Sequence, residues 1–164
     1  MTTGINEAAD AALRAHVRAL LTERQAHLML DDVLNEFPAE RINERMDGLP
    51  YSAWEVLWHL RFTQRDILDF VREGEYAEQD WPTDYWPDPG KAATPEDWQA
   101  EAQAFRDDLA ALLTLLDDPA TDLLAAVPNA TQGQTWLREF LLVADHSAYH
   151  VGQLMLLKRL LGRA

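Results

Sequence analysis

Apolar residues recur at helical spacing along four long segments of this chain. The first segment covers residues 6–21 and the second covers residues 52–72, and in both the apolar side chains return every three or four positions. This periodicity is typical of amphipathic helices that bury one face. Ser52 and Glu55 have the spacing of a capping box, which indicates where the second helix begins, and Gly74 is placed to close it.

The third and fourth segments also carry start and stop signals. Thr94 followed by Pro95 is a favoured helix start, and the third helix is predicted to end before Pro119. The fourth helix is predicted over residues 136–161, and Gly162 stops it. The pattern therefore predicts four long helices.

The connections between these helices are less regular. Residues 22–25 also have the capping-box form, which predicts that the first helix breaks and restarts there, and a short helix is expected at residues 32–37. Residues 76–93 contain three prolines and are predicted to form a loop. The loop also holds three large aromatic residues, Trp81, Tyr85 and Trp86. Aromatic residues argue against disorder, so the loop is expected to pack over the bundle, as a pocket wall or as a cap on the core.

No segment shows the alternating pattern of a strand, and no internal repeat is visible. Four helices with short to medium connections bury their apolar faces most simply as an antiparallel four-helix bundle. A chain of 164 residues is long enough for one substantial core. We therefore expect an all-α fold, with residues 1–164 forming a single domain.

Composition and charge exclude several classes of protein. Hydrophobic residues make up 48% of the chain, but no apolar run approaches the roughly 20 residues of a membrane-spanning helix. The first residues lack the basic and apolar regions of a secretory signal, so a cytoplasmic location is expected. The net charge of −14 repels nucleic-acid phosphates and anionic lipids, so neither nucleic acid nor a membrane is an expected partner.

The absence of cysteine narrows the chemistry. The chain has no disulfide, no thiolate ligand for zinc and no thiol nucleophile of its own. If it handles a reactive thiol, that thiol must arrive with a cosubstrate.

Histidines on the second and fourth predicted helices are candidate metal ligands. His146 and His150 are four residues apart, so they lie one turn apart on the same helix face, and their imidazoles form a half-site for a divalent transition metal. His59, on the second helix, could complete the ligand set. Sequence does not fix the relative depths of these helices, so two interpretations stay open: a three-histidine metal site, or buried histidines that are hydrogen-bonded to their neighbours.

Two motifs resemble the DinB-like superfamily over nearly the whole chain. The first is PYSAWEVLWHL, which contains His59, and the second is HSAYHVGQ, which begins at His146. The resemblance implies a four-helix bundle that binds a divalent metal through a histidine of helix two and a histidine pair of helix four. Carried over by position, the implied ligands are His59, His146 and His150. Members of this family often pair through helices, so a homodimer is a further expectation.

Other polar residues are weaker candidates. His27 could be a fourth ligand, a pocket residue or a surface residue, and a surface or pocket position is expected; His16 is expected to be exposed. Gln153 is placed one turn beyond His150 and could hold its ring or a bound water. Glu55 is expected to serve the capping box. Asp66 is expected to be solvated, and Tyr149 is expected to have a packing or hydrogen-bonding role.

A three-histidine site leaves coordination positions open for water or substrate. The expected function is therefore that of a metal-dependent enzyme that activates water or a small thiol against a small-molecule substrate. Nitrogen ligands suit zinc, nickel, copper or iron, and no other cofactor-binding motif is apparent. Several members of the family resemble thiol-dependent transferases, and others are described as metal-dependent hydrolases by inference alone. The resemblance does not choose between these two activities.

No carboxylate stands between the paired histidines to act as a general base, so catalytic residues stay unassigned. The alternative is a non-catalytic protein that binds metal or a small ligand, such as a stress-response protein or a dimeric interaction module. A metal-free bundle is the third interpretation.

Overall fold

The computed structural model describes residues 6–72, 74–88 and 90–162. It contains the helices α1 (Glu7–Thr22), α2 (Leu30–Leu34), α3 (Ala53–Val71), α4 (Pro95–Asp117) and α5 (Trp136–Leu161), and the short 3₁₀ turns η1 (Ala39–Arg41) and η2 (Thr83–Tyr85). The described residues form no strand, and Ala126 and Thr135 make an isolated bridge. The all-α prediction is confirmed.

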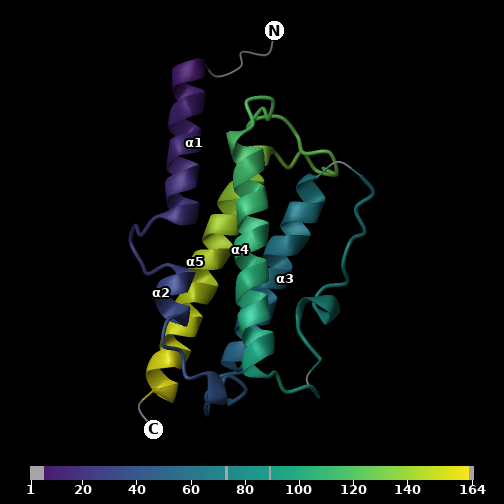
Figure 1. Ribbon diagram of the computed structural model, residues 1–164. Coiled ribbons are helices and arrows are strands. Elements are labelled where there is room, and N and C mark those ends of the chain that lie inside the picture. Colours follow the sequence, from purple (N-terminus) through teal and green to yellow (C-terminus); the bar gives the residue numbers. More distant parts are fainter. Residues whose placement is uncertain (1–5, 73, 89, 163–164) are drawn as a thin grey trace.

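The four long helices do not simply alternate in direction (Figure 1). α3 and α4 run the same way, because Arg61 pairs with Glu101 and Gln64, further along α3, bonds to Phe105, further along α4. α1 and α5 run in the opposite direction. The expected antiparallel arrangement is thus not confirmed for α3 and α4. A long connection has to return along the bundle before α4 can begin.

Capping side chains fix the starts of the long helices. Ser52 and Glu55 exchange side-chain and backbone hydrogen bonds at the start of α3, and Thr94 and Asp97 do the same at α4. Each box satisfies two backbone N–H groups that the first helical turn leaves free. The predicted capping box that begins α3 is confirmed.

The region after α1 differs from its prediction. No helix restarts at residues 22–25: Thr22 is the last residue of α1, its hydroxyl donates to the carbonyl of Arg18 one turn earlier, and Glu23 is extended. The next helix is α2, where the Asp32 carboxylate accepts from the Met29 N–H at 3.0 Å. The short helix therefore occupies Leu30–Leu34 rather than residues 32–37. Residues 22–25 have the sequence of a capping box, but an N-cap residue must lie outside the helix and Thr22 is still helical.

Two groups of buried apolar side chains fill the bundle, one toward each end. One group is built around Leu57, Trp98 and Leu154, and the other around Leu68 and Phe140. α3 and α5 contribute to both groups and pack directly against each other. This contact brings the histidine-bearing helices side by side. None of the helices in the described part of the chain is long and apolar enough to cross a membrane.

Candidate metal centre

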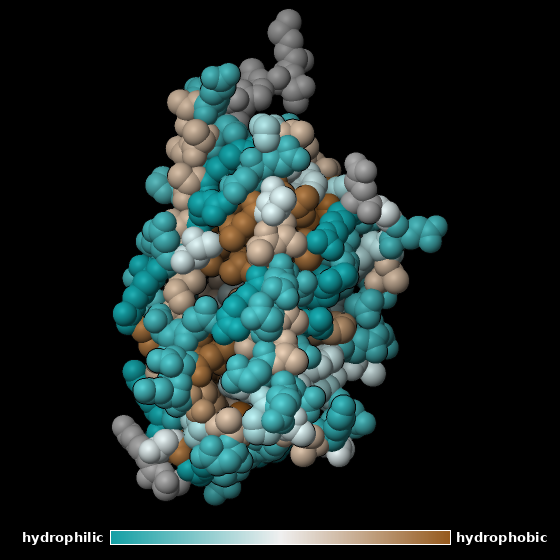
Figure 2. Space-filling view, in the orientation of Figure 1, coloured by the Kyte–Doolittle hydropathy of each residue, from teal (hydrophilic) through white to brown (hydrophobic). Residues whose placement is uncertain are grey.

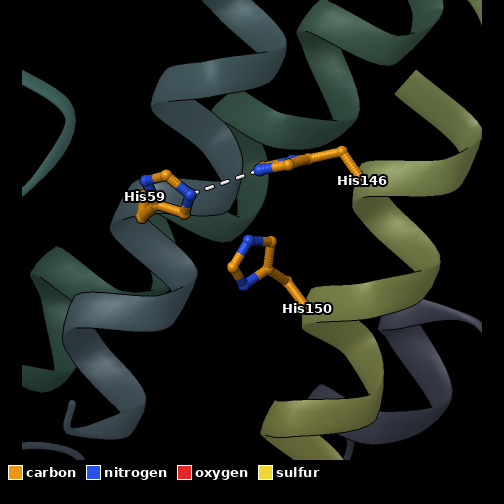
Figure 3. Close-up of side chains that lie close together, drawn as sticks. All are labelled: His59, His146 and His150. Atoms are coloured by element: carbon orange, nitrogen blue, oxygen red, sulfur yellow. Dashed lines mark hydrogen bonds between the residues drawn. The ribbon is translucent and has the colours of Figure 1, made fainter. Parts of the chain in front are cut away.

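His59, on α3, meets His146 and His150, on α5, between the two helices (Figure 3). Nε2 of His146 lies 3.2 Å from Nε2 of His59. One ring nitrogen of each of the three histidines lies within 4.8 Å of the others. α3 and α5 run in opposite directions, and the second turn of α3 lies opposite the middle of α5. The structure thus gives the relative depth of the two helices, which the sequence did not fix.

The hydrogen bonds of two rings fix which nitrogen faces the cluster. Nδ1 of His59 lies 2.8 Å from the carbonyl oxygen of Tyr85, and Nδ1 of His150 lies 2.7 Å from Oε1 of Gln153. Both oxygens can only accept, so both Nδ1 atoms carry the proton and each Nε2 keeps its lone pair. The prediction that Gln153 holds the His150 ring is confirmed. Such partners orient histidines for metal binding.

Burial keeps the three rings neutral. His59 and His150 are buried, with exposed fractions of 3% and 5%, and His146 is half-buried. Burial, together with the neighbouring histidines, lowers the pKa of His146 to about 3 and that of His150 to about 4. Burial also lowers the pKa of His59, although its bond to the Tyr85 carbonyl opposes the shift. Neutral imidazoles are the form that binds metals.

The spacing of two of the ring nitrogens fits ligation of one metal ion. Two nitrogens bound to one tetrahedral ion at about 2.0–2.1 Å are about 3.3–3.4 Å apart. The Nε2 atoms of His59 and His146 are 3.2 Å apart, so this pair needs almost no adjustment. Since His59 Nε2 carries no proton, His146 Nε2 is the donor of the hydrogen bond across this distance. The donor set is all nitrogen and contains no carboxylate among the described residues.

The loop at residues 76–93 forms a wall of this centre. The Trp86 ring stacks on His59, with centroids 4.2 Å apart, and also stacks on Tyr51, with centroids 3.8 Å apart. Tyr85, the neighbouring residue, supplies the carbonyl that accepts from His59. The loop thus packs against the bundle, as expected, and covers one side of the histidine group.

Asp66 is an anchor for this loop and is not simply solvated, which corrects the sequence-based expectation. Its carboxylate accepts from the Tyr76 hydroxyl at 2.9 Å and from the Tyr85 hydroxyl at 2.6 Å, and its side chain is half-buried. Burial and the nearby carboxylate raise the pKa of both tyrosines. The signal that could have revealed this role is the presence of two tyrosines in the loop that faces α3.

The remaining candidates lie outside the cluster. His27 is exposed, with Nδ1 bonded to the carbonyl of Leu28, and His16 is exposed on α1. Glu55 serves the capping box, as expected. Tyr149 is 65% exposed and packs its ring at a right angle to one of the site histidines, with centroids 4.9 Å apart. No carboxylate or fourth histidine joins the three-histidine group within the described residues.

Comparison with known proteins agrees with this geometry. No curated protein and no solved structure matches the chain. A family model described as the DinB family matches residues 15–164, a span that includes all three clustered histidines. The resemblance seen in the two sequence motifs is confirmed, and the chain belongs to the DinB family.

Proposed function

We propose that His59, His146 and His150 bind one divalent transition metal and that the protein uses it to act on a small molecule. The observation that carries the proposal is the convergence of three neutral ring nitrogens, two of them oriented by hydrogen bonds on the far side of the ring. The nitrogen-only donor set suits zinc, nickel, copper or iron. Three ligands leave at least one coordination position for water or a substrate.

When bound, the metal would supply Lewis-acid chemistry, making a water molecule or a small thiol nucleophilic at neutral pH. The chain contributes the surroundings of that reaction. Trp86 stacks flat on His59 and so covers one side of the centre. Gln153 and the Tyr85 carbonyl hold two rings in place, so that the open side faces away from their protonated nitrogens.

A thiol cosubstrate is the nucleophile that we favour. A small thiol ionises at about pH 8.5 even when free, and a coordinating thiol is deprotonated outright, whereas attack by metal-bound water is usually helped by a general base as well. The histidine group of the described residues includes no carboxylate that could act as the base. Because the chain has no cysteine, the thiol must be a small molecule. The reaction proposed is transfer of a thiol to an electrophilic substrate, with hydrolysis as the related alternative.

The second candidate is a protein that binds the metal or a small ligand without catalysis. The absence of a carboxylate from the histidine group also favours this function. The two candidates share the metal site and differ in turnover alone.

Metal content tests the site itself. Untagged protein should contain about one metal ion per chain by elemental analysis, and a His146→Ala/His150→Ala variant should contain almost none. His16→Ala/His27→Ala is the matched control, since both residues are exposed and outside the cluster, and it should retain the metal. Equal metal content in wild type and the cluster variant would overturn the proposal.

Turnover separates the two candidates. The metal-loaded protein is assayed with small thiols against electrophilic acceptors, and with amides and esters for hydrolysis. Thiol-dependent turnover that the cluster variant lacks supports the transferase. A stoichiometric metal without turnover on either panel supports the binding protein.

A further inference from the structure

A cavity lies on a different face of α5 from the histidine pair, where that helix meets α1, α2, α3 and α4. It has a volume of about 200 Å³ and is lined mainly by apolar side chains, among them Leu21, Leu30, Phe105 and Val151. None of the three clustered histidines lines it. Apolar surface between α1 and α4 is visible in Figure 2. The cavity is therefore separate from the proposed metal centre.

Gln64 places a polar group in this apolar lining. Its side chain is 2% exposed and lines the cavity, and its Nε2 donates to the carbonyl oxygen of Phe105 at 2.7 Å. Because a carbonyl oxygen only accepts, this bond fixes the orientation of the amide. Oε1 is then the other end of the amide, and it has no hydrogen-bond partner among the described residues.

A buried amide oxygen without a donor is costly, by about 1–3 kcal/mol. Such groups in native proteins usually meet a water molecule or a ligand. The size of the cavity bears on which of these it is. An apolar cavity of about 150 Å³ binds benzene, so this one has room for a slightly larger ring system.

We propose that this cavity binds a small, uncharged, mainly apolar molecule, of the size of one or two fused rings, that donates one N–H or O–H hydrogen bond to Gln64 Oε1. The apolar lining provides most of the affinity, and the single acceptor provides selectivity. Anions are excluded, because a carbonyl oxygen repels them and no unpaired cationic side chain lines the described cavity.

Exposed side chains at the rim of the cavity mark the route by which a ligand can enter. Asp31 on α2 and Arg106 on α4 form an ion pair there, with Asp31 Oδ1 2.8 Å from an Arg106 nitrogen, and both side chains are exposed. Exposed ion pairs contribute little to stability, so this pair can open at low cost. His27 is also exposed on the same rim. A neutral molecule can thus reach the cavity without disrupting a helix.

Indole and benzofuran are matched probes, since they share a shape and benzofuran lacks the N–H donor. Each is titrated into the full-length protein, and binding is followed by the NMR shifts of backbone amides. Indole should bind about tenfold more tightly than benzofuran, with the largest shifts around Gln64 and the middle of α5. Failure of both probes to bind would overturn the proposal and indicate that water meets Gln64. Equal affinities would overturn the role of Gln64.

Three variants locate the ligand. Gln64→Met keeps the size of the side chain but removes the acceptor, so indole and benzofuran should bind this variant with about equal affinity. Ala148→Phe, which fills the cavity, should abolish binding of both probes; unchanged binding in this variant would show that they bind elsewhere. His146→Ala/His150→Ala should bind indole as the wild type does, so the result is independent of the metal centre. If Gln64→Met does not fold, the probe comparison in wild type and Ala148→Phe still decides.

Discussion

The three histidine rings are held to different degrees, although their Nε2 atoms converge. His59 and His150 each have an acceptor on Nδ1, whereas His146 is bonded through Nε2 to His59 and to no other group in the described structure. His146 is therefore the ring that can turn most freely when a metal enters. Before it can act as a ligand through Nε2, the neutral ring must change tautomer, so that its proton leaves Nε2 and Nδ1 is protonated instead.

Acid should destabilise the metal-free protein through these rings. Their folded pKa values, about 3 for His146 and about 4 for His150, lie below the unfolded value of 6.5. As the pH falls below 6.5, the unfolded chain binds protons that the folded chain does not, so the free energy of unfolding decreases. Between pH 7.5 and pH 5 the loss is up to about 2 kcal/mol for each histidine.

Urea unfolding of chelated protein at these two pH values measures the loss. The wild type should lose more stability than His146→Ala/His150→Ala. Glu101 and Asp108, whose pKa values burial raises, act in the opposite direction in both proteins and cancel from the difference. The same loss in both proteins would contradict the burial of neutral histidines.

At the scale of the element, α3 begins close to the metal centre. Ser52 caps the helix, and His59 follows in its second turn. Ser52→Ala should cost about 1 kcal/mol of stability, and fraying of the first turns should also weaken metal binding. Thr94→Ala removes the equivalent cap of α4 at a similar cost, and α4 carries none of the three histidines. Urea unfolding and metal titration of both variants separate the effects; equal metal affinities would show that the first turn of α3 does not position His59.

The loop anchored by Asp66 is the second element that holds the centre. Asp66→Asn weakens the bonds to Tyr76 and Tyr85 and should cost about 1–3 kcal/mol. Metal should then dissociate faster, because the Tyr85 carbonyl no longer orients His59. Asp69→Asn is the control on the same helix, since its ion pair with Arg65 is exposed and contributes little. Stopped-flow chelation measures dissociation, and equal rates in the two variants would contradict a role for the anchor.

At the scale of the whole molecule, the proposed metal joins helices that are distant in sequence. Binding to the folded chain alone should stabilise it by about 2.7 kcal/mol at a free metal concentration of 100 Kd. Thermal unfolding with and without metal should show this increase in the wild type. The His146→Ala/His150→Ala variant should show none, and an equal increase there would place the metal elsewhere.

Local sequence signals predicted much of this molecule. The Ser52 and Thr94 caps and the His146–His150 pair depend on residues three or four positions apart, so spacing alone identifies them. The direction of α4 relative to α3 depends on packing between distant segments, which periodicity does not encode. The role of Asp66 was missed for the same reason, since its partners lie in a loop without periodicity. The single domain and the homodimer stay predictions.

The parallel course of α3 and α4 gives the intervening connection a second task. It must return along a helix of about 28 Å, and the 23 residues between Val71 and Pro95 could span more than twice that length when extended. Because the connection is longer than the return requires, its chain can also pass over His59 and stack Trp86 on that ring. Shortening this connection should therefore leave a bundle that still assembles but no longer has Trp86 against His59. The connection therefore joins two parallel helices and also covers one side of the proposed metal centre, so its length matters more to the centre than to the assembly of the bundle.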